Sequence, residues 1–441
     1  MRRPSALTPS WTSVVARPLS LALYRALIRT GAPFAGVLLA LRRSRGKEHG
    51  ERLCERRGIA TCARPDGPLI WVHGASVGET LSILPLIEAL SARKPAVSVL
   101  LTSGTVSSAE VIETRAPQRM VHQFMPLDVP EFLERFLDHW HPQLALFVES
   151  ELWPNTISAL KRRGLATVLV NARMSARSSR RWRRAPATIR WLLQSFDLCL
   201  AQSADDARRL TALGGAAVHV TGNLKFDAPP PPITPDALAA LQEAIGDRPI
   251  LVAASTHAGE ESLLAQAHRE LAGAIPGLMT IIAPRHPPRG PAIAQEIAEL
   301  GLTAKLRSRD GLPDADTGIY IADTFGELGL LYRLGEVVFV GGSLVAHGGQ
   351  NPIEPAKLGA AILYGPHTFN FAEIYALIEA EGGGRRVTSQ ASLVEAAKML
   401  LADAAQRRCM AERARCTVES RSGALTRTLT ALRPYLPGRE V

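Results

Sequence analysis

The amino-acid sequence predicts an α/β protein made of two doubly wound domains that face a common cleft. Short apolar runs alternate with helical stretches along the chain, which is the pattern of parallel sheets with helices on both faces. Four successive prolines at 229–232 interrupt this pattern, and such a run can join neither a helix interior nor a central strand. Polar clusters follow the predicted strands, at the sheet edge where open α/β sheets bind ligands. The 441 residues, 46% of them apolar, suffice for two or three domains.

The strands of the first domain are expected in 51–228, and those of the second in 236–441, with a stiff linker at 229–235 between them. In the first domain the apolar runs lie at 69–74, 97–102, 144–148, 166–170, 198–201 and 218–221. In the second they lie at 249–254, 279–283, 318–322, 337–340 and 360–363. A return of the last helix to the first domain is left open.

The net charge of +10 is unevenly distributed. Residues 1–57 carry twelve Arg or Lys and three Glu, and residues 152–196 carry ten Arg or Lys and no acid, so the rest of the chain is acidic. This distribution argues against a general nucleic-acid coat. The five cysteines form no Cys-x-x-Cys pair, which argues against a disulfide scaffold or a structural zinc site.

The segment 1–50 is expected to associate with a membrane. An uncharged run at 30–41 is flanked by basic residues, and Arg25 and Arg29 share one helix face. The run has 12 residues, whereas a spanning helix needs about 20. We therefore expect a helical segment in the interface, with anionic lipid as partner and the body on the cytoplasmic side. A tilted span and a helix docked on the body are the alternatives.

Two acidic clusters close strands of the first domain. Glu79 follows a turn of small residues at the predicted start of a helix. The backbone N–H groups at a helix N-terminus favour binding of an anion. The alternative is a helix cap in which Ser76 is the N-cap and Glu79 its capping-box partner. Glu149 and Glu151 end an apolar strand beside Trp153, an environment that suits acid–base chemistry, and solvated loop carboxylates are the alternative.

Arginines dominate 173–190, with Trp182 and Trp191 close by. We interpret this segment as a face for phosphate groups at an interface, with both tryptophans at headgroup depth. A solvated amphipathic helix is the alternative. A nucleic-acid groove is a third interpretation, supported by this one short segment only.

Phosphate-binding groups follow strands in both domains. Lys225, Arg285 and His286 suit a phosphate at strand ends. The glycine-rich stretches 341–343 and 348–355 offer backbone N–H groups for a phosphate and Glu354 for sugar hydroxyls. The spacing of Asp314 and Asp316 is that of some metal sites, but they lie in a loop before a strand, so we expect a turn.

Taken together, these motifs resemble the 3-deoxy-D-manno-octulosonic acid (Kdo) transferases of lipopolysaccharide assembly. The resemblance covers nearly the whole chain. Its matching segments are 73–79, 149–155, 171–178, 222–227, 255–261, 284–289, 326–328, 339–343 and 348–355. Phe325 stands where many relatives have Met, and Gln350 replaces a frequent His.

The resemblance implies a GT-B fold and an inverting transfer of Kdo from CMP-Kdo to the lipid A precursor lipid IVA. It places the enzyme at the cytoplasmic face of the cell inner membrane and implies neither a metal nor another cofactor. It makes Glu79 the general base, and Glu149 and Lys225 the residues that stabilise the transition state. The CMP-binding residues that it implies are Ser255, Thr256, Arg285, His286, Phe325, Gly326, Glu327, Asn351, Pro352, Ile353 and Glu354. Ser76, Arg173 and Arg177 are placed at the acceptor.

Three rival functions remain at this point. A nucleotide-sugar 2-epimerase shares the fold but would not need the basic N-terminal segment. A transferase for another nucleotide sugar is the second rival. A peripheral membrane scaffold is the third, although it leaves the polar clusters at the strand ends without a purpose.

Overall fold

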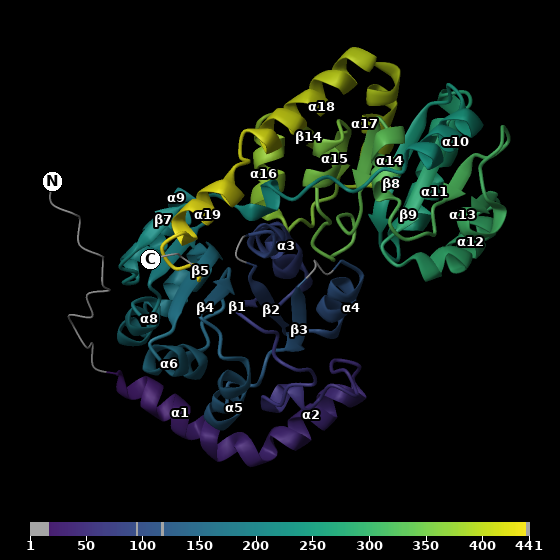
Figure 1. Ribbon diagram of the computed structural model, residues 1–441. Helices are drawn as coiled ribbons and strands as arrows, with labels where there is room; N and C mark the ends of the chain where they lie inside the picture. The colour runs from purple at the N-terminus through teal and green to yellow at the C-terminus, as the bar shows by residue number, and fades with distance from the viewer. Residues whose placement is uncertain (1–16, 94–95, 116–118, 438–441) are drawn as a thin grey trace. The chain divides into compact units, whose positions relative to one another are not determined.

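The computed structural model describes residues 17–93, 96–115 and 119–437. The chain divides into two compact units (Figure 1). Unit 1 holds the residues up to 228 and those from 422 onward, and unit 2 holds residues 229–421. Each unit is built on one seven-stranded sheet whose neighbouring strands are all parallel. The predicted α/β class with two doubly wound halves is therefore confirmed.

The sheet of unit 1 has the order β3-β2-β1-β4-β5-β6-β7. Its strands are β1 Leu69–His73, β2 Ser98–Ser103, β3 Met120–Phe124, β4 Leu144–Val148, β5 Ala166–Ala172, β6 Leu198–Ala201 and β7 Val218–Val220. All side chains of β1 and β4 are buried, as expected of central strands covered on both faces. The strand order reverses between β1 and β4, and open α/β sheets bind their ligands in the crevice at such a switch point, at the carboxyl ends of the strands.

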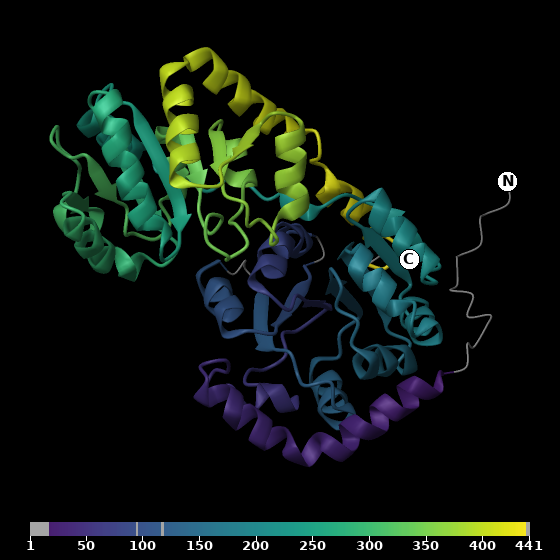
Figure 2. The ribbon, with the colours of Figure 1, turned by 180° about the vertical axis from the view of Figure 1, so that it is seen from behind.

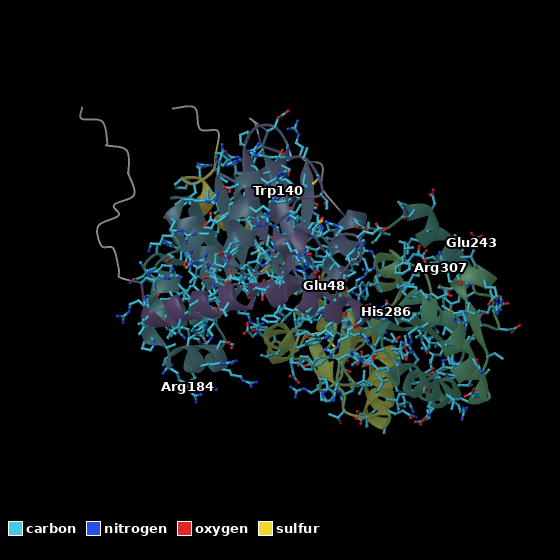
Figure 3. All side chains as sticks on the ribbon, turned by 90° about the horizontal axis from the view of Figure 1, so that it is seen from below. Glu48, Trp140, Arg184, Glu243, His286 and Arg307 are labelled. Carbon is cyan, nitrogen blue, oxygen red and sulfur yellow. The ribbon has the colours of Figure 1, made fainter. Side chains whose placement is uncertain are left out.

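The helices of unit 1 bury its two sheet faces. They are α3 Val77–Ser91, α4 Val106–Arg115, α5 Pro130–Trp140, α6 Pro154–Arg162, α7 Ala176–Trp182, α8 Pro186–Leu193, α9 Ala204–Ala212 and α19 Ala424–Leu432, with short 3₁₀ turns η2 Glu55–Arg57 and η3 Leu224–Phe226. Trp140 lies inside the unit and packs in one cluster with Trp71 (Figure 3). On the other face, α19 joins the apolar cluster under α3, and Asp227 accepts hydrogen bonds from the N–H groups of Gly423 (2.6 Å) and Leu425 (2.7 Å).

The N-terminal arm, residues 17–44, comprises α1 Leu19–Gly31, η1 Ala32–Phe34 and α2 Ala35–Ser44. It runs along unit 1 beside α5 (Figures 1 and 2). Leu21 and Leu39 are buried, and the Tyr24 hydroxyl donates to Asp128 at 3.0 Å. Among the described residues, no helix has both the length and the apolar composition that a membrane span requires.

The sheet of unit 2 has the order β10-β11-β9-β8-β12-β13-β14. Its strands are β8 Ile250–Thr256, β9 Met279–Pro284, β10 Ala304–Leu306, β11 Ile319–Ile321, β12 Val337–Val340, β13 Ala361–Tyr364 and β14 Gly384–Arg386. The helices are α10 Pro235–Ile245, α11 Glu260–Ala274, α12 Gly290–Glu299, α13 Arg307–Asp310, α14 Leu328–Leu334, α15 Ile353–Lys357, α16 Ala372–Ala380, α17 Gln390–Ala402 and α18 Ala404–Glu419, with the 3₁₀ turn η4 Pro287–Arg289. The switch point of this sheet lies between β8 and β12.

The eleven expected strands are all present, and three further strands were not predicted. These are β3, β10 and β14, each at the edge of its sheet. An edge strand has one neighbour and needs no continuous apolar run, so its sequence signal is weak. The segment of Asp314 and Asp316 is a turn in which Asp314 accepts from Thr317 and pairs with Lys305, as predicted.

Candidate active site

The switch point of unit 1 gathers four of the residues singled out from the sequence. His73 ends β1, Glu79 lies in the first turn of α3, and Glu149 and Glu151 follow β4. Because β1 and β4 are neighbours, the polar groups after both strands reach the same crevice.

Glu79 both contributes to the helix cap and is a partly buried acid. Ser76 is the N-cap of α3 and accepts the Glu79 N–H, while the Glu79 carboxylate accepts the Ala75 N–H and the Ser76 hydroxyl, both at 2.8 Å. Ser76 is thus confirmed as the N-cap, but Glu79 does not complete a capping box, because its carboxylate accepts the N–H of Ala75 and the hydroxyl of Ser76 instead of the backbone N–H of Ser76. Burial and, next, the charge of Glu151 nevertheless raise the pKa of Glu79 above its ordinary value, against the opposing effect of Ser76 and Ala75. The cap fixes the carboxylate in place, and burial makes it a stronger base than an exposed Glu.

Glu151 stays ionised beside Glu79. Its carboxylate lies 3.4 Å from Nε2 of His73 and accepts a 2.6 Å hydrogen bond from the Trp153 indole. Burial alone would raise the pKa of Glu151, but His73 and Trp153 bring it below its ordinary value. His73 is itself fully buried, with Nδ1 3.0 Å from the Thr102 hydroxyl. Two nearby carboxylates with pKa values pushed apart are typical of an acid–base site.

Glu149 forms an ion pair with Lys225, whose ammonium group lies 3.0 Å from Oε1. Glu149 directly follows β4, Lys225 lies in η3 after β7, and both side chains are mostly buried. Glu149 has a φ of 58°, in a region that residues other than glycine rarely adopt. Such backbone strain persists where surrounding structure enforces it, commonly at functional sites. Sequence spacing alone does not choose between Glu149 and Glu151, but their partners differ, Lys225 for Glu149 and His73 for Glu151.

A network behind Lys225 was not predicted from the sequence. The Asn223 side chain accepts the Lys225 N–H at 3.0 Å and donates to Gln202 at 3.1 Å. Asn171, fully buried with a φ of 50°, accepts from the Leu224 N–H. The hydrophobic periodicity of the sequence places these polar residues at strand ends. It does not reveal the order of β5, β6 and β7 in the sheet, which brings the residues together.

The predicted acceptor residues lie in different settings. Ser76 forms the N-cap of α3. Arg173 is half-buried, and its backbone N–H donates to the Glu149 carbonyl oxygen at 3.3 Å. Arg177 is exposed on α7, as is Arg184 in the turn that follows (Figure 3). The expectation that Trp191 lies at headgroup depth is wrong, because it is 6% exposed and packs in the core under Lys161. Burying the large apolar surface of the indole in the protein core stabilises the fold.

The switch point of unit 2 gathers the residues predicted to bind the donor. Ser255 and Thr256 end β8, and Ser255 has a φ of 57°. Arg285 and His286 follow β9 with exposed side chains, and His286 is labelled in Figure 3. A Cβ on Gly341, after β12, would lie 2.6 Å from the Ser255 carbonyl oxygen, so only glycine allows this close approach.

The remaining donor residues lie in two turns. Phe325 is 78% exposed and Gly326 has a φ of 81°, whereas Glu327 is held by Arg307 in a two-pronged ion pair at 2.6 and 2.7 Å. The Glu327 carboxylate is thus bound to Arg307 of α13. In the second turn, the Asn351 side chain accepts the Ile353 N–H at 3.1 Å and donates to Glu354 at 3.2 Å, with Pro352 just before α15.

One expectation about the glycine-rich turn after β12 is wrong. Its N–H groups were expected to hold a phosphate, but the buried carboxylate of Glu260 occupies them. Glu260 accepts from the N–H groups of Gly342 (2.6 Å), Ser343 (2.9 Å) and Leu344 (2.9 Å), and also from that of His257 (3.0 Å). The sequence holds both halves of this contact, but they are 82 residues apart and no spacing rule connects them.

Comparison with known proteins identifies the family. The sequence profile described as 3-deoxy-D-manno-octulosonic-acid transferase (kdotransferase) matches residues 51–228. The 3-deoxy-D-manno-octulosonic acid transferase of Haemophilus influenzae is 34% identical over 424 residues, covering 94% of this chain and 98% of the relative. This chain belongs to the 3-deoxy-D-manno-octulosonic acid transferase family. The family's enzyme from Bordetella pertussis is also 34% identical, covering 94% of this chain and 99% of that one.

As a Kdo transferase, the chain is a glycosyltransferase of lipopolysaccharide synthesis. Solved structures agree on its fold. A glycosyltransferase from Rickettsia africae matches with a TM-score of 0.55 at 13% identity, covering 85% of this chain and all of that one. UDP-GlcNAc 2-epimerase from Neisseria meningitidis matches with a TM-score of 0.56 at 15% identity, covering 83% of this chain and all of that one. At such identities these matches show the fold alone.

Proposed function

We propose that this Kdo transferase moves Kdo from CMP-Kdo to a hydroxyl group of the lipid A precursor lipid IVA, with inversion and with Glu79 as general base. The observation that carries the proposal is the setting of Glu79. Its carboxylate is fixed at the crevice of unit 1, its pKa is raised, and an ionised carboxylate and an ion pair accompany it.

The proposed chemistry is a single displacement. The acceptor oxygen forms a bond to the anomeric carbon while the bond from that carbon to the phosphate oxygen breaks, and CMP leaves with the electron pair. Glu79 takes the proton of the acceptor hydroxyl. Attack on the face opposite to the leaving group inverts the anomeric centre.

Glu149 and Lys225 are proposed to stabilise the charges that develop. The sugar gains oxocarbenium character, which the Glu149 carboxylate favours, and the departing phosphate gains negative charge, which a cation favours. The ammonium group of Lys225, at 3.0 Å, also offsets part of the cost of burying the Glu149 carboxylate. The proposed reaction needs the two substrates and no metal or other cofactor.

The donor is proposed to bind unit 2. Arg285 and His286 offer exposed cationic or donor groups to the phosphate, and the aromatic ring of Phe325 is free to contact the cytosine. Asn351 and Glu354 at the start of α15 are proposed to hold sugar hydroxyls. Ser255 and Thr256 would line the same crevice, although Thr256 already donates to Glu261 at 3.0 Å.

The N-terminal arm is proposed to place the enzyme on the cytoplasmic face of the cell inner membrane. One face of the arm packs on unit 1, while the other exposes a row of large apolar side chains: Leu19, Leu23, Leu27, Phe34, Val37, Leu38 and Leu41. Exposed apolar side chains along a helix, flanked by arginines, suit a surface of anionic lipid. The exposed Arg177 and the partly buried Arg173 are proposed to contact the phosphate groups of the acceptor.

The test is a mass spectrum of detergent-dispersed lipid IVA after incubation with the purified protein and freshly generated CMP-Kdo. Wild type is compared with Glu79→Ala and with the control Glu243→Ala, which removes an exposed carboxylate on α10 (Figure 3). We expect one or more Kdo mass increments with wild type and control, and none with Glu79→Ala. Equal increments with Glu79→Ala would leave the transfer but reduce Glu79 to a cap. No increment with folded wild type would contradict the proposed substrates, and interconversion of UDP-GlcNAc would then favour an epimerase.

A further inference from the structure

Two histidines of unit 2 stack face to face at its switch point. The rings of His257, which follows β8, and His347, which follows β12, have centroids 4.1 Å apart and planes 19° apart. The His286 ring lies 6.2 Å from that of His257, edge to face. The three imidazoles therefore come from the ends of β9, β8 and β12, which are adjacent strands in the sheet.

The surroundings of the stack are cationic. Arg285, His286, Arg289 and His347 all act electrostatically on His257. The two carboxylates of α11 at this place do not bind the imidazole nitrogens, because Glu260 accepts from four backbone N–H groups and Glu261 is paired with Arg289 at 2.7 Å. The Gln350 side-chain nitrogen lies 2.9 Å from Nε2 of His257 and adds no charge.

In the absence of a ligand, this arrangement disfavours positive charge on both rings at once. Burial and then the neighbouring positive groups lower the pKa of His257 to about 4. Two protonated rings at this separation would repel each other, and both carboxylates of α11 at this place already have other hydrogen-bond or ion-pair partners. The described residues hold no group of three or more His, Cys, Asp or Glu side chains placed to bind a metal ion.

An anion removes this conflict. A phosphate or carboxylate oxygen beside the stack would accept hydrogen bonds from the imidazoles and supply the missing negative charge. His347 and His286 are exposed and His257 partly so, which leaves the stack open to a ligand. The donor of the proposed reaction carries two such groups, the phosphodiester and the carboxylate of the octulosonic acid.

We propose that the stacked His257 and His347 form the subsite for an anionic group of the sugar-nucleotide donor, and that the stack takes up a proton when this group binds. The inference rests on the proposed function for the identity of the donor. Its consequence is that donor affinity rises as the pH falls, by about tenfold per pH unit for each whole proton taken up.

The test uses two probes that separate the two anions. Cytidine 5′-(methyl phosphate) carries the phosphodiester without a sugar carboxylate, and its binding is followed by calorimetry at pH 6.5 and pH 8.0 in buffers of different ionisation enthalpy. Freshly generated CMP-Kdo carries both anions, and its KM in Kdo transfer is measured over the same range. The variants are His257→Gln and His347→Gln, and the control is His219→Gln, an exposed histidine on β7 of unit 1.

We expect wild type and the control to bind the donor more tightly at pH 6.5 with net proton uptake. Each stack variant should lose that pH dependence and raise the donor KM by about tenfold, the worth of one charge-assisted hydrogen bond. Proton uptake with the methyl phosphate assigns the stack to the phosphodiester, and a pH effect with CMP-Kdo alone assigns it to the carboxylate. Normal Kdo transfer with no pH dependence of donor binding, or with stack variants equal to wild type, would overturn the inference and leave the proposed function standing. Absence of any Kdo transfer by folded wild type would overturn both.

Discussion

The ammonium group of Lys225 lies 3.0 Å from a carboxylate oxygen of Glu149, although 76 residues separate them in the chain. Glu149 directly follows β4, and Lys225 lies in η3 after β7, a strand that is not adjacent to β4 in the sheet. The side chains of Glu149 and Lys225 are only 13% and 18% exposed, so the attraction within the pair offsets part of the cost of burying both charges.

Lys225→Met should therefore lower Kdo transfer by about a hundredfold or more, because it removes a fixed cation and leaves Glu149 buried without this counter-ion. Lys398→Met, on the exposed face of α17, is the matched control. Rates come from the lipid IVA assay, and unfolding midpoints exclude a general loss of structure. A variant with wild-type rate would remove the pair from the chemistry.

Glu151→Gln should move the acidic limb of the pH–rate profile to lower pH. Burial contributes most to the raised pKa of Glu79, and the charge of Glu151 comes second. Removing that charge lowers the Glu79 pKa while leaving the burial effect, so the base stays ionised to lower pH. kcat/KM is measured from pH 4.5 to pH 8.5, with Glu243→Gln as control. A limb that stays in place or moves upward would show that Glu151 does not act on the base.

Aspartate on the outer face of the N-terminal arm should weaken membrane binding. Leu23 and Leu27 are 57% and 70% exposed, and each leucine buried in lipid contributes about 1.5–3 kcal/mol. The double variant Leu23→Asp/Leu27→Asp is compared with Leu312→Asp, which alters an exposed leucine of unit 2. Sedimentation with vesicles containing phosphatidylglycerol measures binding. We expect loss of binding only in the double variant, and equal binding of the two would contradict the proposed role of the arm.

Glu260→Ala should strongly destabilise unit 2. The substitution leaves four N–H groups without their acceptor, and each unsatisfied buried donor costs about 1–3 kcal/mol. Thermal unfolding followed by calorimetry measures the effect, and Glu243→Ala again serves as control. A midpoint equal to that of wild type would mean that water replaces the carboxylate and that the turn after β12 does not depend on it.

Much of the architecture could be predicted from the sequence because central parallel strands are continuous apolar runs. β4 and β12, for example, are buried along their whole length. β3 begins with Met120, Val121 and His122, all partly exposed, and such an edge strand leaves no comparable pattern.

The site could be predicted only in part. Strand ends identified Glu79, Glu149, Lys225 and Arg285 as polar residues in the right places. Partners separated by long stretches of chain were out of reach, such as His73 with Glu151 or Glu260 with the turn after β12. The sheet order creates these contacts, and hydrophobic periodicity does not encode that order. Trp191 was misplaced for a related reason, since composition cannot tell which face of a basic helix is buried.

The most direct test of Glu79 as general base is the pH dependence of kcat/KM for lipid IVA in wild type and Glu79→Gln. Because the ionised carboxylate is the active form and burial raises its pKa, activity should fall as the pH drops through a value above that of an ordinary glutamate. Glu79→Gln should lose about two to four orders of magnitude in rate, and its residual activity should lack this acidic limb. An acidic limb that persists unchanged in Glu79→Gln would assign the titration to another group and contradict the account.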